Sequence, residues 1–296
     1  MKLGFSILSH QAPTLLFQRL LCQLDKFPDK EIAIHHDFNQ TEFDKTLLQG
    51  TSYELVTDYV RTYWSHTNNI KAILETFKML YSKDCDWYIT LSTNCYPVKS
   101  VDYILHFMST TKYDGFIERN NIWTDHFNFY QYFRKGFFTK YMFKVPFVTR
   151  QGKVYQKAIR KRRDKSEILF NDSFIPYHGS DWFAINKKAM KFILESEEKI
   201  NKIVLFLADV NKGPDINVCP PEVVFQTILG NNKNLFLNNN YYRFTDWENA
   251  KDWHPNTLTI RHWNALQSSD ALFARKFKWE ESKDVIELID SEILRT

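Results

Sequence analysis

The sequence of 296 residues predicts an α/β fold with a single, mostly parallel mixed sheet flanked by helices. Short apolar runs alternate with amphipathic segments through its first half, which is typical of strands joined by covering helices. Hydrophobic residues make up 44% of the chain, enough for one large core. No repeat or low-complexity linker divides the sequence. We therefore expect a single domain over residues 1–296.

The predicted strands are short apolar runs, several of which end in polar residues. They are residues 3–8 (LGFSIL), 31–37 (EIAIHHD), 52–56 (SYELV), 87–91 (WYITL) and 114–118 (DGFIE). Ligands bind beyond the carboxyl ends of the strands in open α/β sheets, so residues at three of these ends are candidates for a site. They are Ser9-His10, His35-His36-Asp37 and Ser92-Thr93-Asn94-Cys95.

The predicted helices carry apolar side chains at a spacing of about 3.6 residues. The first begins near Pro13 and continues through Leu24, and the second runs from Ile70 to Leu80. Later helices are expected over residues 187–195, from Glu222 onward, and over residues 285–293. Residues 120–172 are aromatic and basic without a readable period, and we expect an insertion lobe or a lid there.

The charge balance argues against one class of function. The chain has 39 basic and 35 acidic side chains, which is too even for a nucleic-acid-binding protein. Residues 150–165 nevertheless contain eight Lys and Arg and one acid, Asp164. Such a run is usually a solvated face or a loop. The functional alternatives are contact with an anionic membrane surface or with a phosphate-bearing acceptor.

The amino terminus and the cysteines indicate a compartment. The first ten residues run directly into a strand and lack the apolar region and cleavage site of a signal peptide. No stretch approaches the roughly 20 apolar residues of a membrane span. The four cysteines lack zinc-binding spacing, as expected for reduced thiols. We expect a cytoplasmic protein that associates peripherally with the inner face of the cell membrane.

Glu222 and the pair Arg261 and Lys276 each have a structural and a functional interpretation. Glu222 follows the stiff pair Pro220-Pro221 at the start of a predicted helix. The helix dipole favours an acid there, and the same position suits a general base held rigidly at a cleft. Arg261 and Lys276 are cations that could clamp a diphosphate or remain ordinary surface charges.

The order of several motifs resembles one known family. These motifs are VRTYWS (60–65), DWYITLSTNCYPV (86–98), DGFIE (114–118), GSDWFAI (179–185), PPEVVFQTIL (220–229), YRFTDW (242–247), HP (254–255) and LFARKF (272–277). The chain thereby resembles the core-2/I-branching N-acetylglucosaminyltransferase family, whose relatives include the peptide-O-xylosyltransferases. The resemblance implies a GT-A-type nucleotide-binding fold and an inverting transfer from a UDP-sugar to a hydroxyl of a glycan acceptor. UDP-N-acetylglucosamine is favoured by family association alone.

The resemblance also implies roles for individual residues. Glu222 occupies the position of the family's general base, and Arg261 and Lys276 match the cations that hold the donor diphosphate. Asp37 falls where the family binds the nucleotide, and we place His10, Arg61 and Trp64 with it. Trp247 matches an acceptor-stacking residue, and we expect Glu118 and Ser180 to bind the acceptor as well.

The sequence is consistent with the metal independence of that family. Its one DxD motif, Asp84-Cys85-Asp86, precedes the strand 87–91 and therefore lies away from the ligand edge. After that strand, residues 92–95 contain no carboxylate for Mg²⁺ or Mn²⁺. We expect no metal and no other cofactor, with Arg261 and Lys276 replacing the cation. Relatives usually have an acid where this chain has Cys95, which is a departure from the family pattern.

Two classes of function follow. The first is a glycosyltransferase of bacterial surface polysaccharide synthesis, with a UDP-sugar donor and a lipid-linked glycan acceptor. In it, residues 150–165 contact an anionic membrane and no nucleic acid is bound. The alternative is a non-catalytic nucleotide- or carbohydrate-binding protein on the same fold, supported by the replacement at Cys95.

Overall fold

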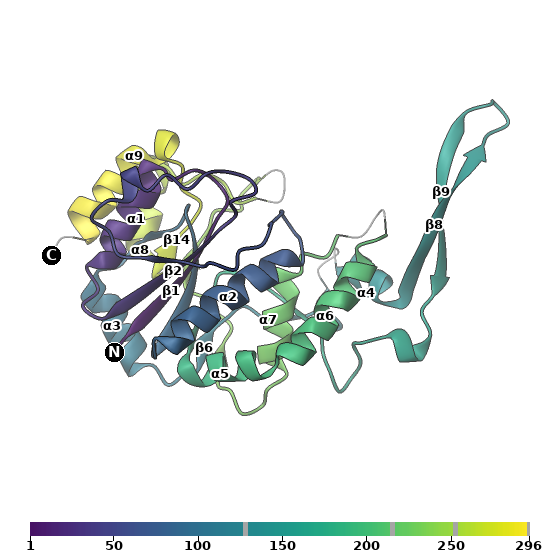
Figure 1. Ribbon diagram of the computed structural model, residues 1–296, viewed down its shortest axis with the longest axis horizontal. Coiled ribbons are helices and arrows are strands. Elements are labelled where there is room, and N and C mark those ends of the chain that lie inside the picture. Colours follow the sequence, from purple (N-terminus) through teal and green to yellow (C-terminus); the bar gives the residue numbers. More distant parts are fainter. Residues whose placement is uncertain (127–129, 214–216, 251–253, 295–296) are drawn as a thin grey trace.

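A seven-stranded sheet forms the centre of the molecule in the computed structural model, which describes residues 1–126, 130–213, 217–250 and 254–294 (Figure 1). Its strand order is β12-β6-β11-β4-β1-β2-β3. The strands are β1 (Leu3–Ser9), β2 (Lys30–His36), β3 (Glu54–Leu55), β4 (Trp87–Ser92), β6 (Gly115–Phe116), β11 (Ala184–Asn186) and β12 (Leu237–Asn238). β11 runs antiparallel to both of its neighbours, and the other pairs are parallel. The predicted α/β fold with a mostly parallel mixed sheet is confirmed.

Helices cover both faces of this sheet, which explains the nearly continuous apolar sequences of β1 and β4. One face packs against α1 (Leu15–Asp25), α3 (Val101–Thr110), α8 (Trp263–Ser268) and α9 (Trp279–Leu288). The other packs against α2 (Asn68–Ser82), α5 (Lys187–Glu195), α6 (Glu197–Val210) and α7 (Pro221–Gly230). Within β1, Phe5 contacts Phe27 on the first face, and the Ser6 hydroxyl lies 2.6 Å from that of Thr76 in α2.

Local signals fix the beginnings of several helices. The side chains of Thr14, Ser100 and Asn186 accept hydrogen bonds from backbone N–H groups in the first turns of α1, α3 and α5. The predicted helices correspond to α1, α2, α5, α7 and α9. Short helical segments also occur at Thr46–Leu48, Lys165–Glu167, Ile260–His262 and Ile289–Ile293. Among the residues described here, no helix has the length and apolar character needed to cross a bilayer.

A small second sheet lies beside the main one and carries part of the candidate site. It has the order β13-β14-β5 and consists of β5 (Tyr96–Pro97), β13 (Arg243–Phe244) and β14 (Phe273–Ala274). β5 follows β4 almost directly, and β14 pairs with it antiparallel. The residues after β14 are thereby placed next to the carboxyl end of β4.

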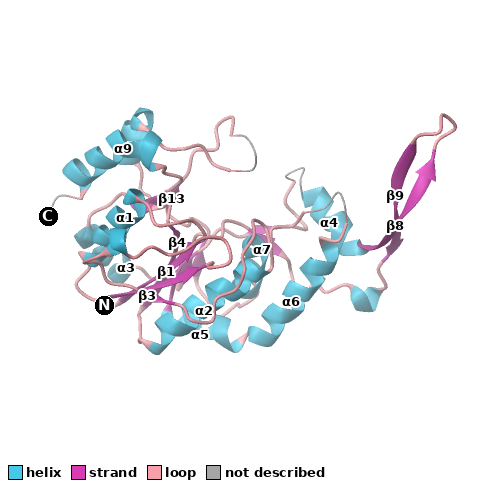
Figure 2. Cartoon of the chain, turned by 45° about the horizontal axis from the view of Figure 1, so that its top comes forward, coloured by secondary structure: helices cyan, strands magenta, loops and turns pink. Residues whose placement is uncertain are grey.

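Residues 122–176 form a lobe that leaves and re-enters the body at a two-stranded ladder. The ladder pairs β7 (Asn120–Asn121) with β10 (Tyr177–His178). α4 (Tyr130–Phe138) packs on the core through Phe133 and Phe137. A hairpin of β8 (Thr139–Val148) and β9 (Val154–Arg162) then projects away from the rest of the molecule (Figures 1 and 2). Its base is joined to α6 by an ion pair of Arg163 with Asp209 at 2.6 Å.

Candidate active site

The carboxyl ends of β1 and β2 meet at one edge of the sheet, as the sequence predicts. The hydroxyl of Ser9 lies 3.0 Å from Nδ1 of His36, and the next residues in the chain are His10 and Asp37. Loss of solvation lowers the pKa of His10; the charge of Asp37 opposes this shift, and the charge of Lys276 reinforces it. Three of the predicted donor-binding residues, His10, Asp37 and Lys276, are therefore neighbours.

The carboxylate of Asp37 fastens a loop to the end of β2. It accepts hydrogen bonds from the backbone N–H and the hydroxyl of Thr62 at 2.6 and 2.9 Å, from Gln40 Nε2 at 2.6 Å, and from Asn39. Burial alone would raise the pKa of Asp37, but these donors hold it well below its usual range. A carboxylate has about four lone-pair sites, so little acceptor capacity is left for a ligand. Asp37 therefore positions the adjoining segment.

That segment exposes a cation and aromatic rings near α7. The guanidinium of Arg61 lies 5.0 Å from the ring centroid of Tyr63. Trp64 is 59% exposed and packs edge-on against His254. The hydroxyl of Ser65 donates to Asn217 Oδ1 at 3.0 Å, which joins the loop to the segment before α7. An exposed Trp beside an Arg suits stacking on a base or a sugar ring.

Lys276 is a half-buried cation near other cations. Its pKa is lowered by burial and by the charges of Arg275 and Lys278. The adjacent Phe277 donates its N–H to the carbonyl of Asn94 at 3.0 Å, which places Lys276 beside the end of β4. A desolvated ammonium with cationic neighbours is stabilised by a bound anion, and a diphosphate supplies one.

Arg261 lies on a segment that adjoins Lys276. The N–H of Leu258 donates to the carbonyl of Lys276 at 2.8 Å, and Arg261 follows in the short helix Ile260–His262. Its guanidinium lies 3.6 Å from Asp246, and both residues line a cavity of about 710 Å³. The N–H of Glu248 and the side chains of Asn256 and His262 lower the pKa of Asp246 to about 2. Asp246 is thus a fixed anion that orients Arg261.

The exposed Trp247 directly follows Asp246, on the Arg261 side of the site. Glu118 and Ser180, the other two predicted acceptor-binding residues, contact each other instead. Glu118 Oε2 accepts a hydrogen bond from the N–H of Ser180 at 2.9 Å. The intervening Gly179 has no room for a side chain, because a Cβ there would lie 2.1 Å from the carbonyl oxygen of Glu118. The structure therefore brings Glu118 and Ser180 together and places Trp247 with Arg261.

Glu222 stands in the first turn of α7 with its carboxylate turned toward His178. The helix begins at Pro221, whose fixed φ suits the first helical position. His178 Nε2 lies 3.1 Å from Glu222 Oε2, while His178 Nδ1 lies 3.2 Å from the hydroxyl of Tyr130. The side chain of Glu222 is 37% exposed. A carboxylate held by one imidazole and still open to solvent is suited to take a proton from a ligand.

A second carboxyl lies near Glu222. Burial, and then the charge of Glu222, raise the pKa of Asp181 to about 7. The Arg275 guanidinium opposes this shift and stacks 4.4 Å from the ring of Trp182. Arg275 precedes Lys276, so the cluster of Glu222, His178 and Asp181 adjoins these two cations.

His178 and Asp181 are not among the site residues predicted from the sequence, because they precede the antiparallel strand β11. The prediction rests on polar residues that follow parallel strands, since these lie at the carboxyl ends of the strands. β11 runs the other way, so the residues before it reach the same edge as those after β4. The hydroxyl of Thr90 in β4 donates a hydrogen bond to the carbonyl of Asp181 at 3.1 Å, which joins the end of β4 to the segment before β11. The polar residues HGSD ahead of a short strand were the available signal.

Cys95 is a buried residue beneath the site. Its sulfur accepts a hydrogen bond from the N–H of Ser92 at 3.3 Å and closes the turn after β4. The buried Arg243 lies close enough for its pKa, which burial lowers, to be raised in part by Cys95. The departure from the family pattern thus falls on a residue that supports the sheet edge.

The acids of the DxD motif lie at the opposite end of β4. Asp84 forms an ion pair with Lys187, and Asp86 accepts a hydrogen bond from the N–H of Lys2 at 2.7 Å. Both precede β4, as the sequence predicts. Within the described ranges, no group of three or more His, Cys, Asp or Glu side chains is arranged to hold a metal ion.

The α/β fold thus brings together cations near the strand ends and a partly exposed carboxylate at a helix start. The model of the Core-2/I-Branching enzyme family matches residues 3–270, and the chain belongs to this family. The family expected from the motifs is confirmed.

Curated relatives are similar at low identity. The β-glucuronosyltransferase GlcAT14B of Arabidopsis thaliana is 26% identical over 71% of this chain and 44% of its own length. GlcAT14C of the same plant is 26% identical, over 89% of this chain and 62% of its own length. Xylosyltransferase 2 of Rattus norvegicus is 21% identical, over 77% of this chain and 26% of its own length. The chain thus spans about half the length of the first of these relatives.

Solved structures overlap with the chain only in part. A UDP-glucose pyrophosphorylase mutant from Leishmania major in complex with UDP-glucose is 12% identical, with a TM-score of 0.35, over 79% of this chain and 61% of that one.

Proposed function

We propose that this protein is an inverting glycosyltransferase in which Glu222 deprotonates the acceptor hydroxyl. The carrying observation is the position of Glu222, which is partly exposed, hydrogen-bonded to His178 and adjacent to the cationic side of the site. Family membership supports the same reaction class, since its curated relatives are named as glucuronosyl- and xylosyltransferases.

The chemistry is a single displacement. The acceptor oxygen attacks the anomeric carbon as its proton passes to Glu222, and the bond from that carbon to the nucleoside diphosphate breaks on the opposite face. The configuration at carbon therefore inverts. His178 orients the base through Oε2, and Lys276 and Arg261 stabilise the charge that develops on the leaving diphosphate.

The donor of this proposal is a UDP-sugar bound without a divalent metal. Two cations on adjoining segments, Lys276 and Arg261, supply the positive charge that a metal provides elsewhere. The exposed Trp64 and Arg61 would stack on the base. UDP-N-acetylglucosamine is the first candidate, and the names of the relatives add UDP-glucuronate and UDP-xylose.

The acceptor is proposed to be a growing bacterial surface glycan, and it would meet the partly buried Glu118 and Ser180 and the exposed Trp247. A lipid-linked acceptor would bring the enzyme to the inner face of the cell membrane from the cytoplasm. The basic composition of residues 150–165 supports this location.

Calorimetric titration with UDP and the three UDP-sugars, first in EDTA and then with Mn²⁺, tests the donor site. Saturable binding in EDTA that Mn²⁺ does not strengthen is the expected result, and the sugars rank themselves in the same experiment. Binding that needs Mn²⁺ would overturn the role of Lys276 and Arg261. Absence of binding in both buffers would favour the non-catalytic alternative or another nucleotide.

A further inference from the structure

The β8–β9 hairpin combines strong positive charge with exposed apolar side chains. Residues 139–162 contain eight Lys and Arg and no Asp or Glu. Phe143, Phe147, Val148, Val154 and Tyr155 each leave more than half of their surface exposed. An exposed apolar surface of this kind marks a contact site more often than a solvated one.

The strand register sorts these side chains. Phe147 lies opposite Tyr155, and Phe143 lies opposite Ile159, so all four belong to one face of the ribbon. Val148 and Val154 form a pair next to the turn, on the other face. The outer half of the hairpin therefore carries apolar side chains at its tip and on one face, where Lys157, opposite Val145, lies among them.

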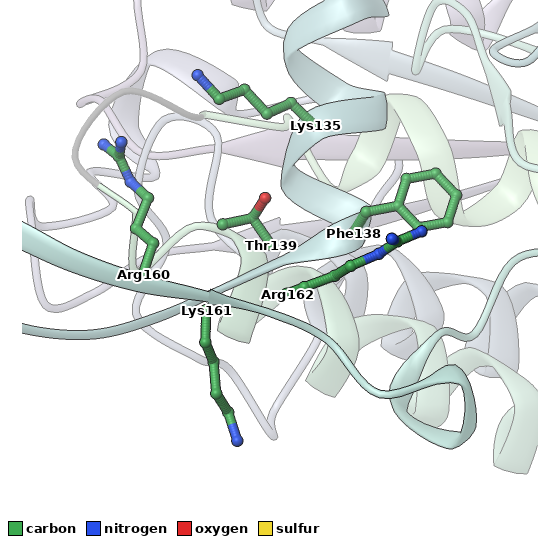
Figure 3. A pocket seen from close by; sticks show the side chains of 6 residues that line it. All are labelled: Lys135, Phe138, Thr139, Arg160, Lys161 and Arg162. Atoms are coloured by element: carbon green, nitrogen blue, oxygen red, sulfur yellow. The ribbon is translucent and has the colours of Figure 1, made fainter.

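Cations lie at the turn, on both faces of the strands and at the base of the hairpin. At the base, a hollow of about 520 Å³ is lined by Lys135, Phe138, Thr139, Arg160, Lys161 and Arg162. Figure 3 shows Arg160 and Lys135 pointing to one side of the ribbon and Lys161 pointing to the other. Cations that diverge in this way do not converge on one compact anion. They match an extended surface of negative charge.

The hairpin projects from the body beyond α4 and α6, so a flat surface can reach its tip (Figures 1 and 2). A two-stranded ribbon alone in water is marginally stable, and a partner that covers its apolar face would stabilise it. A second copy of the same ribbon is disfavoured, because it would bring eight cations against eight. The apolar tip is unlike a nucleic-acid-binding surface, whose contacts are mainly polar and charged.

We infer that the β8–β9 hairpin docks the protein on a membrane that contains acidic lipids. Phe143, Phe147 and Tyr155 enter the interfacial region, and the surrounding Lys and Arg lie among the headgroups. The docking itself does not depend on the proposed function. Only its role, which is to bring the site to an acceptor carried on lipid, rests on that function.

Sedimentation of the full chain with lipid vesicles tests the docking. Vesicles of phosphatidylcholine with about one third phosphatidylglycerol are compared with phosphatidylcholine alone, at low and high salt. We expect binding to the acidic vesicles only, and its loss at high salt. Equal binding to both vesicle types, or to neither, would overturn the inference.

Two sets of variants locate the contact. Replacing Lys144, Arg150, Lys153 and Lys157 by Gln should weaken partition into acidic vesicles by roughly 10²- to 10³-fold, since each cation contributes about fivefold. The matched control replaces the exposed Lys45, Lys112, Lys191 and Lys233 and should retain most of the binding. Phe143→Ser with Phe147→Ser and Tyr155→Ser should lose roughly tenfold or more, against Leu205→Ser as the control. Unchanged partition of either hairpin variant contradicts the assignment.

Independent readouts separate the possible failures. Indole fluorescence of Phe147→Trp should shift to shorter wavelength with acidic vesicles, and no shift would contradict insertion. UDP affinity of every hairpin variant should equal that of the wild type, so loss of docking and failure of the donor site are distinguishable. A wild-type dimer or oligonucleotide complex that forms without vesicle binding, and that the hairpin variants abolish, would assign the surface to that partner and overturn the inference.

Discussion

Two desolvated carboxyls of the site, Asp37 and Asp181, have opposite pKa shifts. Asp37 on the donor side meets N–H and O–H donors, which hold its pKa below its usual range. Asp181 on the acceptor side meets the charge of Glu222 in a desolvated environment, which raises its pKa to about 7. Burial is common to both, so the neighbouring groups decide the outcome. Asp37 therefore holds a loop in place as a carboxylate, whereas the pKa of Asp181 lies in the neutral range.

The largest expected effect comes from removing the acid of the acceptor side. Glu222→Gln should lower kcat by about 10²–10⁴-fold and leave UDP affinity near that of the wild type, because an amide cannot take the acceptor proton. Glu198→Gln, which removes a first-turn acid from α6, is the matched control. Full turnover of Glu222→Gln in a transfer assay would exclude Glu222 as the general base and leave it as an ordinary acid at a helix start.

The cations of the donor side should affect binding more than turnover. Lys276→Ala and Arg261→Ala are each expected to weaken UDP binding by about 1.5–3 kcal/mol, the scale of a charge-assisted contact. Calorimetry provides the measurement, and the exposed neighbour Lys278→Ala provides the control. UDP affinity that stays at the wild-type value in both variants would exclude a diphosphate clamp.

Asp37→Asn tests the loop attachment. An amide cannot accept all the hydrogen bonds that Asp37 receives, so the free energy of unfolding should fall by about 1.5–3 kcal/mol. UDP binding should weaken with it, because the segment of Arg61 and Trp64 loses its anchor. Urea unfolding and UDP titration measure the two effects, with the exposed Asp44→Asn as the control.

The pH dependence of that stability has a definite sign. The pKa of Asp37 is lower in the folded protein than its value near 4 in the unfolded chain. Asp37 therefore stabilises the fold at pH values above about 4, and this stabilisation is lost as the pH falls below about 4. The difference in stability between wild type and Asp37→Asn should therefore shrink in acid. A difference that is constant from neutral pH to pH 3 would contradict the assignment.

Asp181→Asn should change the pH dependence of stability with the opposite sign. A carboxyl with a raised pKa stabilises the fold below its unfolded value near 4, and this stability is lost as the pH rises through 7. The melting temperature of Asp181→Asn relative to that of the wild type should thus rise by a few degrees between pH 4 and pH 8. If the melting temperatures of wild type and Asp181→Asn change in parallel with pH, Asp181 does not have the raised pKa that distinguishes it from Asp37.

The sequence predicted those parts of the fold whose pattern is local. β1, β2, β4, α1 and α2 are apolar runs or amphipathic segments of ordinary length, and each lies where its period indicates. α3 buries only Ile104 and Met108 among its ten residues, which is too weak a stripe to recognise. The β8–β9 hairpin has apolar residues on both faces near its tip, so it lacks the alternation of a half-buried strand.

Prediction of the site was limited by residues that are distant in sequence. His10, Asp37 and Lys276 were found because they follow strands or match family motifs, and the structure makes them neighbours. His178 and Asp181 were missed because they precede a reversed strand. The contact of His178 with Glu222 depends on the packing of β10 against α7, which no local pattern encodes.

The ladder of β7 and β10 holds the two ends of the lobe side by side. Asn120 pairs with His178 and Asn121 with Tyr177, so the chain leaves and returns at adjacent positions. Segments with neighbouring ends can be inserted or exchanged with little effect on the domain that holds them. Because α4 of the lobe packs on the core, the β8–β9 hairpin is the part that can change in length while the ladder keeps Glu118 and His178 in register. Such an arrangement lets the delivery of the enzyme to its acceptor evolve independently of the chemistry.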